Sequence, residues 1–232
     1  IETGVSDNAE GSARVKIGKT EVMVGIKMDV GTPYPDSPDK GNLMVTAELL
    51  PLSSPRFESG PPRFPAIELG RVVDRSIRHT DFIDFKKLCI AEGEKVWTVM
   101  IDIYSINDDG NLLDAAGIGA IAALKDAKIP FYDPKTEKID HSKPAKDGLP
   151  LGKGLPITIT VQKIGNSFII DPTLEEEDIV DTRVTVGITE GIITSMQKGK
   201  EQSLKVEEFN NILDIAEKSS KDIASKIEKA LK

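Results

Sequence analysis

Alternating apolar and polar residues predict two strands near the start of the chain. Apolar side chains occupy every second position from 22 to 28, the period of a strand with one buried face. A shorter run over 14–17 precedes them, and Gly18-Lys19 lies between as a tight hairpin turn. Apolar runs over 43–52 and 96–106 are also typical of strands. We therefore expect a sheet in the first half of the chain.

Two helices are predicted among these strands. Over 66–79, apolar residues such as Leu69 and Val73 recur at three-to-four spacing, which indicates one buried face, and Pro65 suits the first turn. Residues 112–127 are small and apolar on almost every side. The second helix is therefore expected to be buried.

The second half of the chain repeats the same kinds of element. A hairpin is predicted over 157–170, two strands over 182–196, and an amphipathic helix over 205–232. A stretch rich in proline, glycine and lysine precedes them. Helices segregated from hairpins favour an α+β sandwich over a doubly wound parallel sheet. We divide the chain into a first lobe (1–130), a linker or loop (131–156) and a second lobe (157–232).

Composition limits the kinds of partner. The 232 residues carry a net charge of −8, which argues against free-standing nucleic-acid binding. Any such contact must use a local basic patch on an acidic body. No apolar run reaches the roughly 18 residues that span a membrane, so no membrane partner is expected.

Few residues are suited to metal binding or covalent catalysis. His79 and His141 lie far apart in the sequence, and Cys89 is the one cysteine. A zinc site or a Cys/His pair is therefore not expected, and we expect no metal and no cofactor. A lone cysteine also suits the reducing cytoplasm. The carboxylates at 175–178, together with Asp181, could bind a metal or form an acid–base pair, but such a run before a strand is more often solvated surface.

Three arginines share one face of the first predicted helix. Arg71, Arg75 and Arg78 stand at i, i+4 and i+7, so their guanidinium groups project together and are able to grip successive phosphates. The alternative is a solvated face with local ion pairs. Glu68 precedes Arg71 by three residues and Asp74 precedes Arg78 by four, so both pairs are possible.

The loop before this helix interleaves basic and aromatic residues. Arg56 and Arg63 stand beside Phe57 and Phe64. Such a pattern holds single-stranded nucleic acid by phosphate contact and base stacking. The alternative is that the aromatic rings only fix the loop to the core.

Four phrases of the sequence carry a resemblance: AEGSA at 9–13, SP at 54–55 with GPP at 60–62, RVVDR at 71–75 and DGNLLDA at 109–115. They resemble the RNase PH family, and more narrowly the non-catalytic ring subunits of the archaeal exosome. They occur in the family's order and with similar spacing over nearly the whole chain. The resemblance implies the family's RNase PH-like (ribosomal S5 domain 2-like) fold, a two-lobe α+β sandwich of antiparallel or mixed sheets with helices.

The resemblance also implies partners. The ring it implies is hetero-hexameric, a trimer of dimers in which this chain pairs with a catalytic RNase PH-like subunit. The ring also carries RNA-binding cap subunits with S1/KH-type domains. Such a ring shortens single-stranded RNA from its 3′ end by phosphorolysis. The arginines matching Arg71 and Arg75 grip RNA near the partner's active site, and Arg78 continues that face. Where relatives usually carry acidic residues before this helix, this chain has Arg63-Phe64-Pro65.

The same resemblance implies that this chain lacks catalytic residues. Active members carry Gly-Thr-Arg after the Asp-Gly turn, where they hold phosphate at a helix start. Here the matching residues are Asn111, Leu112 and Leu113. Active members also carry two aspartates six residues apart, but the sixth residue after Asp178 is Val184. Two alternatives remain: a self-sufficient phosphorolytic exoribonuclease, and a purely structural ring spacer.

Overall fold

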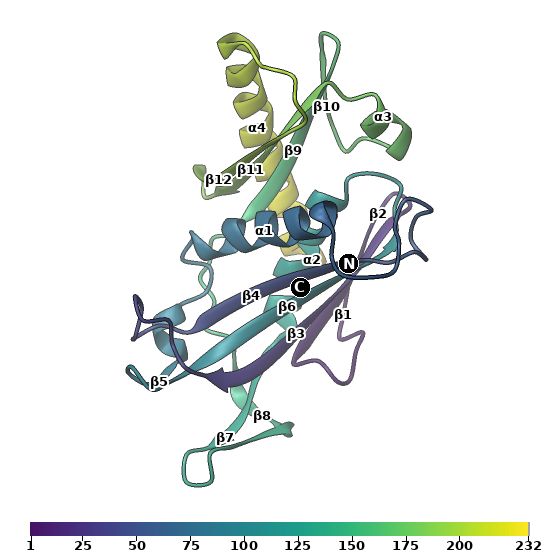
Figure 1. Cartoon of the computed structure of the whole chain (residues 1–232). Helices are drawn as coiled ribbons and strands as arrows, with labels where there is room; N and C mark the ends of the chain where they lie inside the picture. The colour runs from purple at the N-terminus through teal and green to yellow at the C-terminus, as the bar shows by residue number, and fades with distance from the viewer. Residues whose placement is uncertain (232) are drawn as a thin grey trace.

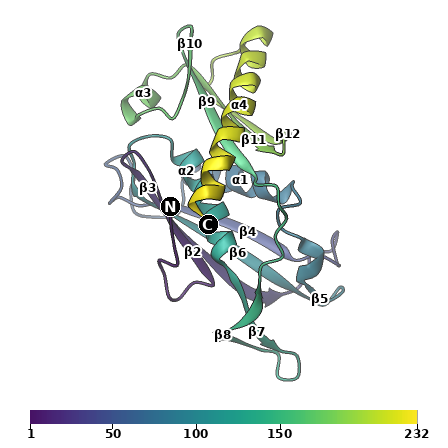
Figure 2. The ribbon, with the colours of Figure 1, turned by 180° about the vertical axis from the view of Figure 1, so that it is seen from behind.

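The chain folds into stacked layers of sheet and helix (Figure 1). The computed structural model describes residues 1–231, apart from the side chains of residues 144–147. Helices α1 (Phe64–Arg78) and α2 (Leu112–Asp126) lie between two sheets. Helix α4 (Val206–Ala230) covers the outer face of the second sheet, as the view from behind shows (Figure 2).

The first sheet has the strand order β1-β2-β3-β6-β4, with β5 paired to β6. Its neighbours are antiparallel except β4 and β6, which run parallel. The predicted hairpin is confirmed, since Ile17 pairs with Thr20 around Gly18-Lys19. The elements are β1 (Glu2–Thr3), β2 (Gly11–Ile17), β3 (Thr20–Gly31), β4 (Asn42–Leu49), the 3-10 turn Phe85–Leu88, β5 (Cys89–Ala91) and β6 (Lys95–Asn107).

The two central helices bury the faces that their sequences predict. Helix α1 begins two residues earlier than expected, with Pro65 in its first turn. It crosses β4 so closely that a Cβ on Gly70 would lie 3.2 Å from the Val45 carbonyl oxygen. Helix α2 is buried on most sides, as predicted, and a Cβ on Gly119 would lie 2.7 Å from the side chain of Val24.

The second sheet has the order β10-β9-β11-β12 and presents two different faces. On β9, Thr158 lies against α2 and Thr160 bonds to it, while Ile159 points to α4. The face toward α1 and α2 is therefore polar and the face toward α4 apolar. The elements are β9 (Ile157–Ile164), β10 (Ser167–Ile170), α3 (Leu174–Asp178), β11 (Thr182–Thr189) and β12 (Ile192–Gly199).

The prediction of a linker or loop over 131–156 was wrong for much of that segment. Strands β7 (Lys128–Asp133) and β8 (Lys138–Gly148) form an antiparallel hairpin that projects from the first sheet (Figure 1). Prolines such as Pro130 suggested a break in the pattern. In a sheet of two strands every strand is an edge strand, and edge strands tolerate proline.

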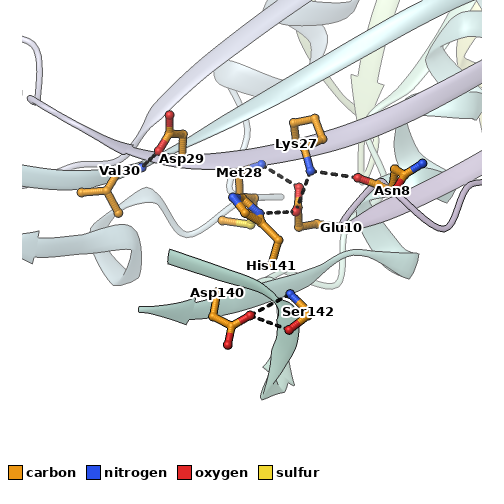
Figure 3. A network of polar contacts seen from close by, with 9 residues as sticks. All are labelled: Asn8, Glu10, Lys27, Met28, Asp29, Val30, Asp140, His141 and Ser142. Carbon is orange, nitrogen blue, oxygen red and sulfur yellow. Dashed lines mark hydrogen bonds and ion pairs between the residues drawn. The ribbon is translucent and has the colours of Figure 1, made fainter. Parts of the chain in front are cut away.

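A buried carboxylate fastens this hairpin to the first sheet (Figure 3). The Glu10 side chain is 6% exposed and accepts hydrogen bonds from Lys27 Nζ at 2.8 Å and from the Met28 N–H at 2.9 Å. His141 Nδ1, on β8, lies 2.8 Å from the same carboxylate. Burial alone would raise the pKa of Glu10, but these bonds outweigh it and the pKa is lowered.

Candidate nucleic-acid interface

Helix α1 presents two of the predicted arginines without a counter-charge. Arg71 is exposed, and among the described residues it makes no ion pair. Arg75 is half-buried, and its Nη1 donates to Oε1 of Gln197 on β12 at 3.4 Å. A neutral amide leaves the arginine charge intact, so both guanidinium groups remain available to an anion.

Arg78, by contrast, is held within the protein. Its Nε and Nη2 donate to the Asp74 carboxylate at 3.0 and 2.5 Å, and Nη2 also donates to the Leu43 carbonyl at 2.7 Å. The bond to Asp74 outweighs burial and raises the pKa of Arg78. The local ion-pair interpretation is therefore confirmed for Arg78.

The other ion pair that helical spacing allows on α1 does not form. Glu68 does not bond to Arg71 but pairs with Arg183 of β11 in the second lobe. Because these two residues are 115 positions apart, helical spacing gives no indication of the contact. The result is an inter-lobe ion pair beside an unpaired Arg71.

The basic residues of the preceding loop are also paired with carboxylates. Arg56 pairs with Asp178, and Arg63 Nη2 lies 2.6 Å from the Glu58 carboxylate on the open surface. The ring of Phe64 is 71% exposed, so it does not fix the loop to the core. The loop therefore offers an exposed ring and arginines that already have partners.

Asn111 opens helix α2 in a left-handed backbone conformation, with φ at 58°. Its N–H donates to Oε1 of Glu177 at 2.9 Å, and its side-chain amide donates to Asp171 at 2.9 Å. A helix start attracts anions through its free N–H groups and its dipole. A carboxylate of the chain itself therefore occupies the anion position at the start of α2.

A cavity of about 460 Å³ lies beside this helix start. Its wall includes Leu112 and Leu113, together with Phe57 and Phe64. Aliphatic and aromatic side chains have no donors for an anion. This apolar part of the wall offers orthophosphate no donors, and the arginines on the same wall, Arg56 and Arg183, are already paired with carboxylates.

The aspartates near this cavity already have partners within the chain. Asp178 lies at the cavity rim but is engaged with Arg56, and Val184 is 1% exposed in the core. Asp181 accepts a hydrogen bond from the Gly165 N–H at 2.7 Å. Helix α3, which carries the acidic run, has no buried residue, as expected for solvated surface.

One buried carboxyl joins α2 to the second sheet. Asp114 is 4% exposed and accepts hydrogen bonds from the Thr160 N–H at 3.0 Å and from Thr160 Oγ1 at 2.7 Å. Burial raises its pKa to about 7, although both bonds favour the charged form. Asp114 is therefore a titratable contact between the lobes.

Two kinds of feature are absent from the part of the chain that the structure describes. No three histidine, cysteine, aspartate or glutamate side chains cluster there as metal ligands. No helix there is long and apolar enough to cross a membrane.

The fold defines the class of protein, a two-lobe α+β sandwich with helices between its sheets. Residues 1–130 match the family described as "3' exoribonuclease family, domain 1", and residues 154–219 match its domain 2. The chain belongs to this RNase PH family of 3′ exoribonucleases, and the expected RNase PH-like fold is confirmed.

Two similar proteins come from archaea. "Exosome complex component Rrp42" of Methanocella arvoryzae is 47% identical over 230 residues, covering 98% of this chain and 85% of the relative. The protein of the same name from Pyrococcus furiosus is 45% identical over 234 residues, covering 100% of this chain and 84% of the relative.

Solved structures give the same assignment. A chain of the Archaeoglobus fulgidus exosome with RNA bound to the active site superimposes with a TM-score of 0.87 at 43% identity, covering 97% of this chain and 85% of that one. A chain of an archaeal exosome core superimposes with a TM-score of 0.83 at 39% identity, covering 97% of this chain and 84% of that one. Rice Rrp46, with a TM-score of 0.73 at 18% identity, shares the fold.

Proposed function

We propose that this chain is a non-catalytic ring subunit of an exosome. It contributes to RNA binding and to the active site of a catalytic partner in 3′-to-5′ phosphorolytic RNA degradation. One contrast carries the proposal: Arg71 and Arg75 lack a counter-charge on the edge of α1, while Glu177 fills the anion position of α2. The names of the archaeal relatives support the same role.

The proposed assembly is a hetero-hexameric ring. It is a trimer of dimers with a catalytic RNase PH-like subunit, it carries cap subunits with S1/KH-type domains, and its substrate is single-stranded RNA. The similarity to exosome chains supports this arrangement. The free thiol of Cys89 fits a cytoplasmic location.

The electrostatics explain why such a subunit needs a partner. With a net charge of −8, the chain as a whole repels RNA. Arg71 and Arg75 offer two local phosphate contacts, and each contact to a single strand contributes about 0.7 to the log–log salt slope. This chain alone is therefore expected to bind RNA weakly, and a partner must supply the remaining positive field.

Charge reversal on α1 tests the proposal. The ring is assembled by co-expression with a catalytic partner, using either the natural chain or the double variant Arg71→Glu with Arg75→Glu. The expected result is normal assembly, slower phosphorolysis and an RNA salt slope lower by about 1.4, because two contacts are lost. Lys218→Glu with Lys229→Glu on α4 is the control, since it changes the net charge equally on a different surface.

The alternatives are outcomes of the same experiment. An unchanged rate and salt slope in the arginine double variant would show a purely structural spacer. Phosphate-dependent release of nucleoside diphosphates by this chain alone would show a self-sufficient exoribonuclease. Two features argue against that second outcome. The side chains of Leu112 and Leu113 offer orthophosphate no hydrogen-bond donors, and the Glu177 carboxylate repels it.

A further inference from the structure

Strand β12 lies beside α1, with one of its faces turned toward the helix. Directly opposed residues of an antiparallel pair point to the same side of the sheet. Gln197 is opposed to Thr185, whose hydroxyl bonds to Thr160 on the inner face, whereas Lys198 is opposed to Val184 on the face toward α4. Gln197 therefore faces α1, and Lys198 points to the other side of the sheet.

Gln197 contacts Arg75 without neutralising it. Its Oε1 accepts from Arg75 Nη1 at 3.4 Å, and its Nε2 donates to the Lys198 carbonyl oxygen at 3.4 Å. The second bond fixes which way the amide points, so the oxygen stays turned toward the arginine. Gln197 therefore contacts the guanidinium group and leaves its full charge.

Lys200 follows directly after β12 in an unusual backbone conformation. Its φ is 64°, a left-handed value that is costly for a residue with a side chain. Its carbonyl oxygen accepts a bond from Lys198 Nζ at 2.8 Å, which holds this turn. The turn places Lys200 on the wall of the cavity that also includes Phe64 and Glu68 at the start of α1.

The charges around this cavity single out Lys200. Arg183 is paired with Glu68, and Arg56 is paired with Asp178. Within the described part of the chain, Lys200 makes no ion pair. Arg71, Arg75 and Lys200 are thus three cations without a paired carboxylate along one edge of a strongly acidic chain.

We propose that β12 forms a second wall of the RNA-binding surface. Gln197 is a positioning residue for Arg75, and Lys200 contacts a further phosphate of the single-stranded RNA at the rim of the cavity. This inference rests on the proposed role of Arg71 and Arg75. It extends their contact from one helix to the neighbouring strand.

Lys200→Ala in the assembled ring tests the additional phosphate contact. RNA affinity is measured over a series of salt concentrations, beside Lys218→Ala on α4 as the matched control. Lys200→Ala is expected to lower the salt slope by about 0.7, and the control leaves it unchanged. If Lys200→Ala keeps the salt slope of the natural protein while the arginine double variant lowers it, the Lys200 contact is refuted and the proposed function stands. If the arginine double variant also keeps the natural slope, the proposed function fails as well.

Gln197→Ala tests the positioning role. Affinity is expected to fall about three- to tenfold with the salt slope unchanged, because the charge of Arg75 remains. The same substitution in an Arg75→Ala background is expected to have no further effect. Gln197→Glu, which adds a counter-charge, is expected to lower the slope as Arg75→Ala does. Natural affinity in Gln197→Ala, or an equal loss with and without Arg75, would refute the positioning role.

Discussion

Replacement of Asp114 by asparagine offers a quantitative test of the inter-lobe contact. The carboxyl is buried against Thr160, and its pKa rises from the usual 3.8 to about 7. Between these values the native state keeps a proton that the unfolded chain has released. The free energy of unfolding therefore falls as pH rises through this window. Asparagine has no proton to lose, so the variant lacks this dependence.

The size of the effect follows from the two pKa values of Asp114. The interval from 3.8 to about 7 corresponds to about 4 kcal/mol of stability present below pH 4 and lost by about pH 7. This figure is an upper value, since relaxation of the structure around the charged carboxylate reduces it. Asparagine still provides one oxygen acceptor for Thr160, so near pH 4 the two proteins are expected to differ less than at neutral pH.

Urea unfolding at a series of pH values from 4 to 8 measures the difference. Subtracting the free energy of unfolding of Asp114→Asn from that of the natural protein cancels the titration of every other group that the substitution leaves undisturbed. The variant is expected to gain relative stability steadily as pH rises and to level off above about pH 7. Parallel stability curves for the two proteins would refute the argument, because they would show that Asp114 titrates equally in both states.

Three further substitutions have expected outcomes. Glu177→Ala frees the start of α2, so added phosphate is expected to raise the melting temperature more than chloride at equal ionic strength, an increase absent from the natural protein. Gly110→Ala is expected to cost about 1–3 kcal/mol in urea unfolding, since φ is +97° and a Cβ would lie 2.3 Å from the Pro172 carbonyl oxygen. Glu10→Gln weakens the bond to Lys27 and is expected to lower the free energy of unfolding by about 1–3 kcal/mol. Because the pKa of Glu10 is lowered in the native state, this loss should shrink as pH falls below 4.5, and a loss independent of pH would contradict the argument.

Local patterns predicted most of the elements but few of the contacts that shape the site. Alternation over 22–28 and the position of Pro65 were sufficient for β3 and α1, because strands and helices are set by near neighbours. Helix α3 was not predicted, although Thr173 and Glu176 form a capping box whose spacing is visible in the sequence.

The missed contacts join residues far apart along the chain. Helical spacing allowed Glu68 to pair with Arg71, yet it pairs with Arg183 of the other lobe. Glu177 caps Asn111 from 66 residues away, and helical or strand periodicity carries no information about such a distance. Which arginines keep a free charge therefore depends on tertiary structure, and Arg71 is distinguished from Arg78 only once the fold is known.

Helix α2 has one further consequence, for how the molecule unfolds. Its apolar side chains, such as Ile121, share a core with Ile26 of the first sheet, and its Asp114 bonds to Thr160 of the second. Neither half is then an autonomous folding unit, because severing the chain near residue 130 leaves this helix without half of its cover. Denaturation is expected to occur in a single cooperative transition, and an isolated half should aggregate rather than fold.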